Sequence, residues 1–153
     1  MLIEAATEPD FPVLLGIWES AVRATHHFLP EASLQDIKSQ LIPAYFPQVQ
    51  LFLVRRKADG QILGFAGIAG QKLEMLFVAP EHHGLGVGKA LLNFVVDQHF
   101  INAVDVNEQN PQAAGFYLSQ GFVQVDRSVL DGQGNPFPIL HLQYSSAVSG
   151  RKN

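Results

Sequence analysis

Three glycines at alternate positions, Gly84, Gly86 and Gly88, separate an apolar segment that ends at Val78 from a helix-forming segment that begins at Lys89. A helix N-terminus leaves about four backbone N–H groups unpaired and carries a partial positive charge, and both features attract phosphate. Glycine lets the backbone approach such a ligand and adopt a positive φ. The spacing therefore predicts a phosphate-binding turn between a strand and a helix.

Two common phosphate-binding motifs do not fit this turn. A Walker A loop needs Ser or Thr after its Gly-Lys pair, but Ala90 follows Lys89. A dinucleotide fingerprint, G-x-G-x-x-G, would need its third glycine at Lys89, and it expects a parallel sheet around its first strand. A nucleotide-binding fold that uses the same turn stays open as an alternative, and it predicts affinity for ATP or NAD.

Composition limits the chemistry that can accompany the turn. The 153 residues suit one domain, and the absence of cysteine excludes a disulfide framework, a thiolate nucleophile and sulfur-ligated zinc. The histidines and carboxylates show no metal-ligand spacing, so we expect no metal. The net charge of -4 argues against a nucleic-acid partner. With no secretion signal and no apolar run of about 18 residues, we expect a cytoplasmic protein with no membrane partner.

Apolar periodicity and turn signals give the order of the elements around the turn. Strand patterns occupy residues 2–6, 50–57, 61–69, 72–78, 103–106, 122–130 and 137–144. Helical patterns follow Thr7 and Ser33, run from Lys89 to about Val96, and run from Asn110 to about Gln120. This order predicts a mixed α/β (α+β) fold in which helices pack on a single sheet.

Local signals add detail to these elements. Thr7 with Asp10 and Ser33 with Asp36 predict the N-caps of the first two helices. The Asp59-Gly60 pair, at 59–60, predicts a two-residue type I′ hairpin.

The strand at 72–78 precedes the glycine turn, and its two faces carry different side chains. Simple alternation puts Glu74 on the same face as Leu76 and Val78. It puts Leu73, Met75 and Phe77 on the opposite face.

Residues 78–88, VAPEHHGLGVG, resemble the acetyl-CoA pyrophosphate loop of the GCN5-related N-acetyltransferase (GNAT) superfamily. In the family pattern, [Gln/Arg]-x-x-Gly-x-[Gly/Ala], Gly86 and Gly88 match and His83 departs. Backbone amides hold much of the pyrophosphate in the family, so we expect binding to survive. The element order over 1–144 is also similar, which implies one GNAT-like domain with a flexible tail at 145–153. It further implies a mainly antiparallel sheet of about seven strands with about four helices.

The resemblance implies acetyl-CoA as cosubstrate and assigns its contacts to the strand end, the turn and the helix at 110–120. The expected contacts are Leu76, Phe77, Val78, His83, Gly84, Leu85, Gly86, Val87, Gly88, Lys89, Asn107, Asn110, Phe116 and Tyr117. Asn107 would bond the pantetheine amides, although its type also suits a turn. Asn110 also stands where the helix that begins at Pro111 needs an N-cap.

Glu74 and Tyr117 are the catalytic residues that the resemblance implies. An alkylamine has a pKa near about 10.4, so it must lose a proton before it attacks. Glu74 matches a frequent general-base position and would act directly or through a water, and the alternative is a solvent-facing residue. Tyr117 matches the tyrosine that donates to the CoA sulfur, and the alternative is a core aromatic.

The acceptor amine would lie near the end of the first helix and near the last strand. His26, Phe28 and His141 are the expected substrate contacts, and either His26 or His27 could also assist deprotonation. The acceptor is a small-molecule, peptide or protein amine, and the protein is a monomer or a homodimer. A non-catalytic CoA-binding sensor is the alternative function, and it predicts binding without turnover.

Overall fold

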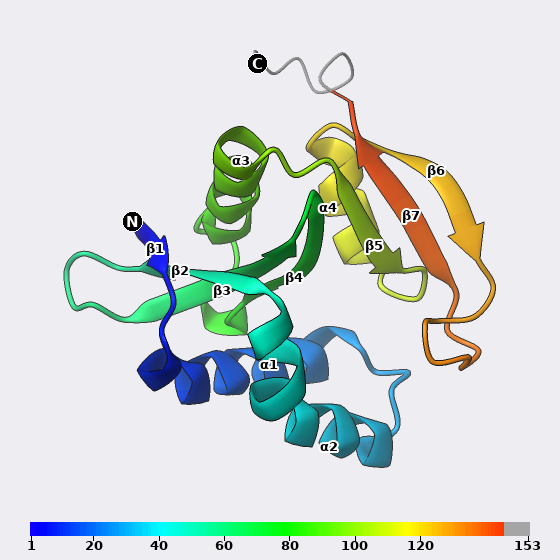
Figure 1. Cartoon of the computed structure of the whole chain (residues 1–153), viewed down its shortest axis with the longest axis horizontal. Coiled ribbons are helices and arrows are strands. Elements are labelled where there is room, and N and C mark those ends of the chain that lie inside the picture. The colour runs from blue at the N-terminus through cyan, green and yellow to red at the C-terminus, as the bar shows by residue number, and fades with distance from the viewer. Residues whose placement is uncertain (146–153) are drawn as a thin grey trace.

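One seven-stranded sheet, in the order β1-β2-β3-β4-β5-β7-β6, runs through the computed structural model (Figure 1). The structure describes residues 1–145, so the predicted tail lies outside the described residues, apart from Ser145. The strands are β1 (Leu2–Ala5), β2 (Gln50–Arg55), β3 (Ile62–Ala69), β4 (Lys72–Val78), β5 (Ala103–Asn107), β6 (Phe122–Ser128) and β7 (Ile139–Tyr144). The helices are α1 (Phe11–Thr25), α2 (Glu31–Gln40), α3 (Val87–His99) and α4 (Pro111–Ser119). The predicted fold class is confirmed.

The sheet divides between its only parallel pair of described strands, β4 and β5. These strands pair only at Lys72 with Ala103 and at Leu73 with Val104. Beyond that point β5 continues against β7 as far as Asn107, while β4 continues against β3. Figure 1 shows the β5–β7–β6 arm turned away from the half formed by β1 to β4. The edge of β4 that faces β5 is therefore without a strand partner after Leu73.

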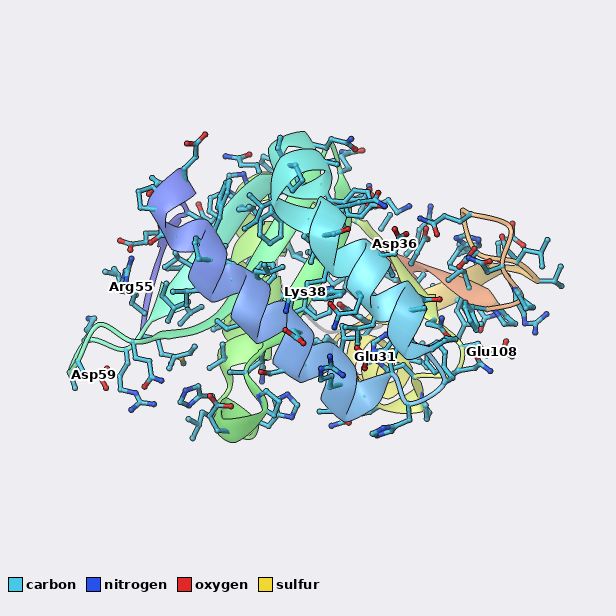
Figure 2. The ribbon with its side chains drawn as sticks, turned by 90° about the horizontal axis from the view of Figure 1, so that it is seen from below. Glu31, Asp36, Lys38, Arg55, Asp59 and Glu108 are labelled. Carbon is cyan, nitrogen blue, oxygen red and sulfur yellow. The ribbon has the colours of Figure 1, made fainter. Side chains whose placement is uncertain are left out.

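Each face of the sheet carries its own apolar core. Strand alternation in β2 sends Phe52 and Val54 toward α3 and sends Leu51 and Leu53 toward α1. One face of α1 is buried through Leu14, Ile17, Trp18, Ala21 and Val22. Figure 2, which views the molecule from below, shows α1 and α2 lying across the sheet. The gap between β4 and β5 therefore lies between the core beneath α3 and the core beneath α1.

Strand β4 departs from the predicted alternation. Met75 pairs with Gly67 and Leu73 pairs with the next residue of β3, so Glu74 is an extra residue in a β-bulge. Leu73 packs in the core beneath α3, whereas Met75 and Phe77 pack in the core beneath α1. The predicted grouping of Leu73 with those two residues is wrong, because the bulge shifts the alternation by one position.

The connection between β2 and β3 is longer than predicted. β2 ends at Arg55, and the Arg56 N–H donates to the Gln61 carbonyl at 2.9 Å. Only Gly60 takes a positive φ, at 74°, within this connection. The Asp59 carboxylate instead accepts the Gln61 N–H at 3.1 Å. The two-residue type I′ turn is wrong, because Asp59 forms a side-chain turn and stays out of the left-handed region.

Thr7 caps the short 3₁₀ turn Glu8–Asp10 that leads directly into α1, whose own N-cap is Asp10, and the predicted cap at Ser33 is wrong. The Thr7 N–H donates to the Asp10 carboxylate at 2.9 Å, which fixes the turn that leads into α1. The second helix begins at Glu31, so Ser33 lies inside it and caps nothing. Pro30 is the N-cap, with an extended ψ of 148° that lets the helix begin two residues before Ser33. No helix in the described part of the chain is long and apolar enough to cross a membrane.

Candidate active site

A cavity of about 320 Å³ lies where β4 has parted from β5. Its wall comes from the end of β4, the glycine turn with the start of α3, the first half of α4 and the end of α1. The lining residues are Ala21, Thr25, His26, Leu76, Phe77, Val78, His82, His83, Gly84, Gly86, Val87, Gly88, Lys89, Asn110, Gln112, Ala113, Phe116 and Tyr117. Because α1 and α4 pack on opposite faces of the sheet, the cavity connects the two faces.

The glycine turn has the conformation that a phosphate cradle needs. Gly84 and Gly86 take positive φ values of 84° and 81°, and Gly86 is the N-cap of α3. No side chain in the described part of the chain caps this helix, so its first N–H groups are available to a ligand. Gly88 takes no positive φ, and an added Cβ would lie at an ordinary contact distance of 3.7 Å from Phe116 and from Val78, so this position does not require glycine. The turn fits the pyrophosphate of a nucleotide-type cosubstrate.

His82 and His83 occupy different places beside the turn. His83, at the position that departs from the family pattern, is exposed and lines the cavity. His82 is buried, with Arg56 Nη2 at 3.3 Å from its Nδ1, and its Nε2 has no hydrogen-bond partner among residues 1–145. The sequence reasoning missed His82 as a cavity residue, because two adjacent histidines carry no signal of which one turns inward.

Helix α4 brings a capping amide and a phenol to the cavity. The Asn110 Oδ1 accepts the Ala113 N–H at 3.2 Å, so this residue is the predicted N-cap as well as a wall residue. Tyr117 lies between the rings of Phe116 and Phe122, at centroid distances of 5.2 Å and 5.7 Å. Burial raises the pKa of Tyr117. Its hydroxyl therefore stays protonated at neutral pH and can act as a proton donor.

His26 ends α1 and faces the cavity from the other side of the sheet. Its Nδ1 lies 2.7 Å from Thr25 Oγ1, and this hydroxyl donates to the Ala21 carbonyl at 2.8 Å. Burial, with a smaller contribution from His27, lowers the pKa of His26. Thr25 also lines the cavity, and the sequence reasoning missed it. A hydroxyl directly before an imidazole was the signal that could have found it.

Five residues expected at the site lie outside the cavity wall: Glu74, Leu85, Asn107, Phe28 and His141. Glu74 is exposed at the β4 bulge, and Leu85 is exposed in the glycine turn. Asn107 accepts the backbone N–H two residues ahead at 2.8 Å, which is its turn-forming alternative.

Phe28 joins two connections of the chain. Its ring lies 5.3 Å from that of His26 and 5.4 Å from that of Phe137, centroid to centroid. The connection between α1 and α2 therefore meets the connection between β6 and β7. Phe28 supports the cavity residue His26 from behind and does not form part of the wall.

His141 belongs to a polar network across four strands. Its Nε2 lies 2.7 Å from Ser128 Oγ, and its Nδ1 lies 2.7 Å from Asp105 Oδ1. Lys72 Nζ reaches the other oxygen of Asp105 at 2.6 Å. Burial raises the pKa of Asp105, but hydrogen bonds from Lys72 and His141 outweigh it and lower the pKa overall. The network ties β4 to the arm at the point where the strands separate.

Within residues 1–145, no three His, Cys, Asp or Glu side chains gather in a way that could hold a metal ion.

Comparison with known proteins agrees with this geometry. The family model of the acetyltransferase (GNAT) domain matches residues 20–137. The chain is 37% identical over 134 residues to the peptidyl-lysine N-acetyltransferase YjaB of Escherichia coli (strain K12), covering 88% of this chain and 90% of that protein. It is 32% identical over 126 residues to the peptidyl-lysine N-acetyltransferase YiaC of the same organism, covering 82% and 85%.

Solved structures share the fold. The solution structure of apo-form YjaB from Escherichia coli superposes with a TM-score of 0.83 at 34% identity, covering 94% of this chain and 98% of that one. The PaiA N-acetyltransferase from Thermoplasma acidophilum, solved in complex with coenzyme A, gives 0.69 at 21% identity, with 94% and 100% covered, and shows the fold alone. The chain therefore belongs to the GCN5-related N-acetyltransferase superfamily and is an acetyl-CoA-dependent N-acetyltransferase.

Proposed function

We propose that this protein transfers an acetyl group from acetyl-CoA to the side-chain amine of a peptidyl lysine. The observation that carries the proposal is the cavity, which joins a phosphate-type turn to a buried phenol and continues to the opposite face of the sheet. The relatives YjaB and YiaC, which are named peptidyl-lysine N-acetyltransferases, support lysine as the acceptor class.

The cosubstrate would bind along two parts of the wall. The N–H groups of the turn, at 83–88, would hold the pyrophosphate at the positive end of α3. The β4 edge from Leu76 to Val78 faces a gap where β5 no longer pairs, so its backbone groups can bond the pantetheine amides as an added strand would. These contacts would place the thioester near Tyr117.

The reaction then follows from the groups around the thioester. The neutral lysine nitrogen attacks the carbonyl carbon, the C–S bond breaks, and the electron pair leaves with sulfur. The Tyr117 hydroxyl supplies the proton that sulfur needs. The attacking amine also loses a proton, and Glu74, the acceptor that the sequence predicts, is exposed at the bulge and lies outside the wall. The chain contains no cysteine, so an acetyl-cysteine intermediate is excluded and the amine attacks the thioester directly.

The acceptor class is tested with three matched amines. The first is a peptide with one lysine and a blocked N-terminus, the second is the same peptide with alanine for lysine and a free N-terminus, and the third is spermidine. Mass spectrometry after incubation with acetyl-CoA is expected to find one acetyl group on the lysine peptide and little on the others.

Other outcomes have defined meanings. Preferential acetylation of the N-terminal amine or of spermidine would contradict the lysine assignment while leaving the transferase chemistry intact. Acetyl-CoA binding without turnover on any amine would favour the sensor alternative. A cytoplasmic location and a monomeric or homodimeric state stay predictions from the sequence.

A further inference from the structure

The half-buried imidazole of His26 and the buried phenol of Tyr117 line the cavity from opposite sides. Partial burial of His26 and full burial of Tyr117 are the main causes of the pKa shifts of these two groups. Burial lowers the pKa of His26 and raises the pKa of Tyr117, so both groups are neutral near pH 7. Two titratable groups whose pKa values are pushed apart in this way are suited to act as base and acid in one reaction.

We propose that His26 accepts the proton of the attacking amine and that Thr25 positions it for this task. The proposal rests on the proposed transferase function and assigns the proton acceptor within that same site. It differs from the expectation for Glu74, whose side chain lies outside the cavity wall.

The hydrogen bonds around Thr25 determine which nitrogen of His26 is free. A backbone carbonyl can only accept, so the Thr25 hydroxyl proton points to the Ala21 oxygen at 2.8 Å. The hydroxyl oxygen then accepts the His26 Nδ1–H at 2.7 Å. This fixes the tautomer, and Nε2 keeps the lone pair that can take a proton.

The ring of His26 is held in place from several directions. Its backbone N–H donates to the Val22 carbonyl at 2.7 Å as the last bond of α1. The Phe28 ring packs against it at 5.3 Å and is itself held by Phe137. His26 therefore needs little reordering when an acceptor enters from the α1 side.

The surroundings of His26 favour its neutral form. The titratable groups that share the cavity or adjoin it are Tyr117 from α4, Lys89 from α3, His82 and His83 from the segment before α3, and His27 from its own connection. Among the described residues, no carboxylate lines the cavity to stabilise an imidazolium. The base is therefore available near neutral pH.

The proton balance uses both groups once in each turnover. As the nitrogen–carbon bond forms, one N–H proton of the amine passes to His26 Nε2. Cleavage of the C–S bond then completes the amide product. Tyr117 gives its proton to the sulfur and becomes a phenolate. The proton on His26 then returns to Tyr117 through solvent, so the site recovers its starting state and no other reactant is needed.

The first test compares kcat/KM for the lysine peptide between pH 6 and 9 in His26→Gln, Glu74→Gln and the matched control His27→Gln. We expect His26→Gln to lower kcat/KM by about 10²-fold at pH 7, with a smaller loss at pH 9, where solvent takes the N–H proton more readily in place of the imidazole. Acetyl-CoA affinity should stay within about twofold, and His27→Gln should behave as wild type. If Glu74→Gln shows this pH-dependent loss and His26→Gln does not, the proposal is wrong.

The second test needs no turnover. The ¹⁵N–¹H spectrum of the imidazoles at pH 8 should show His26 protonated at Nδ1 in the wild type and in Thr25→Ser, and at Nε2 in the isosteric Thr25→Val. The same pair should separate in rate, with Ser close to wild type and Val at least tenfold slower. A wild-type His26 protonated at Nε2 would overturn the proposal. If spermidine is the true acceptor, the same kinetic comparison is made with spermidine. Failure of the lysine assignment can then be distinguished from failure of the His26 proposal.

Discussion

Tyr117 contributes a hydroxyl that is buried among aromatic rings and still lies on the cavity wall. Burial disfavours a phenolate, so the raised pKa keeps the proton on the hydroxyl. The departing thiolate gains negative charge in the same water-poor site and can accept a hydrogen bond, and then the proton, from this hydroxyl. The chemistry that this residue supports is therefore proton donation and not nucleophilic attack.

Removing the Tyr117 hydroxyl should slow turnover and leave binding intact. We expect Tyr117→Phe to lower kcat by about 10²-fold, which is typical for loss of a general acid, with the acetyl-CoA Kd within about twofold. Thiol release measures the first quantity and calorimetric titration the second. Tyr144→Phe is the matched control, because Tyr144 packs against Phe122 but does not line the cavity. A fall of less than about threefold in Tyr117→Phe would contradict the donor role.

At the residue scale, the local pattern was enough to predict the glycine turn. Tyr117 and His26 followed from the resemblance to the family, and all of these residues line the cavity. The position of Glu74 could not be predicted, because the bulge depends on the register between β3 and β4, and the sequence of β4 alone does not determine that register. His82 and Thr25 were missed because inward orientation depends on packing between distant elements.

At the scale of elements, β3 positions the end of β4 through a close approach at Gly64. Gly64 pairs with Val78, and an added Cβ would lie 2.8 Å from the Phe77 carbonyl oxygen and 3.0 Å from a Val87 methyl group. Both Phe77 and Val87 belong to the cavity wall. The glycine therefore allows the sheet and α3 to meet at the site.

Adding a methyl group at Gly64 should destabilise the fold and displace the wall. We expect Gly64→Ala to lower the free energy of unfolding by about 1–3 kcal/mol, as overpacking in a tight core does, and to weaken acetyl-CoA binding. Gly16→Ala is the matched control in α1, where an added Cβ meets nothing within 4 Å. It should stabilise by about 0.5–1 kcal/mol through helix propensity. Urea unfolding measures both changes, and equal stability of the two variants would count against this account.

The order of elements could be predicted because the spacing of apolar residues in each segment is enough to indicate a strand or a helix. The exact connections were harder. Asp59 is a residue type that is typical of tight backbone turns, but here its side chain forms the turn by accepting the Gln61 N–H. The insertion of β7 between β5 and β6, and the limited β4–β5 pairing that opens the cavity, are set by long-range register.

At the scale of the whole molecule, two halves of one sheet are held together at few points. Two residue pairs join β4 to β5, and the Lys72–Asp105 ion pair at 2.6 Å adds a side-chain link at the same place. A ligand in the gap would contact the β4 half, α4 and α1 together. Binding should therefore stabilise the molecule as a unit and not one half alone.

Calorimetric melting of the wild type with and without acetyl-CoA shows whether this cavity takes the cosubstrate. A ligand at 100 times its Kd adds about 2.7 kcal/mol. For a chain of this length that corresponds to a rise in Tm of about 5–10 °C. We predict this rise with acetyl-CoA and CoA, and at most about 1 °C with ATP or NAD at the same concentration. No rise with millimolar acetyl-CoA, or an equal rise with ATP, would contradict the account.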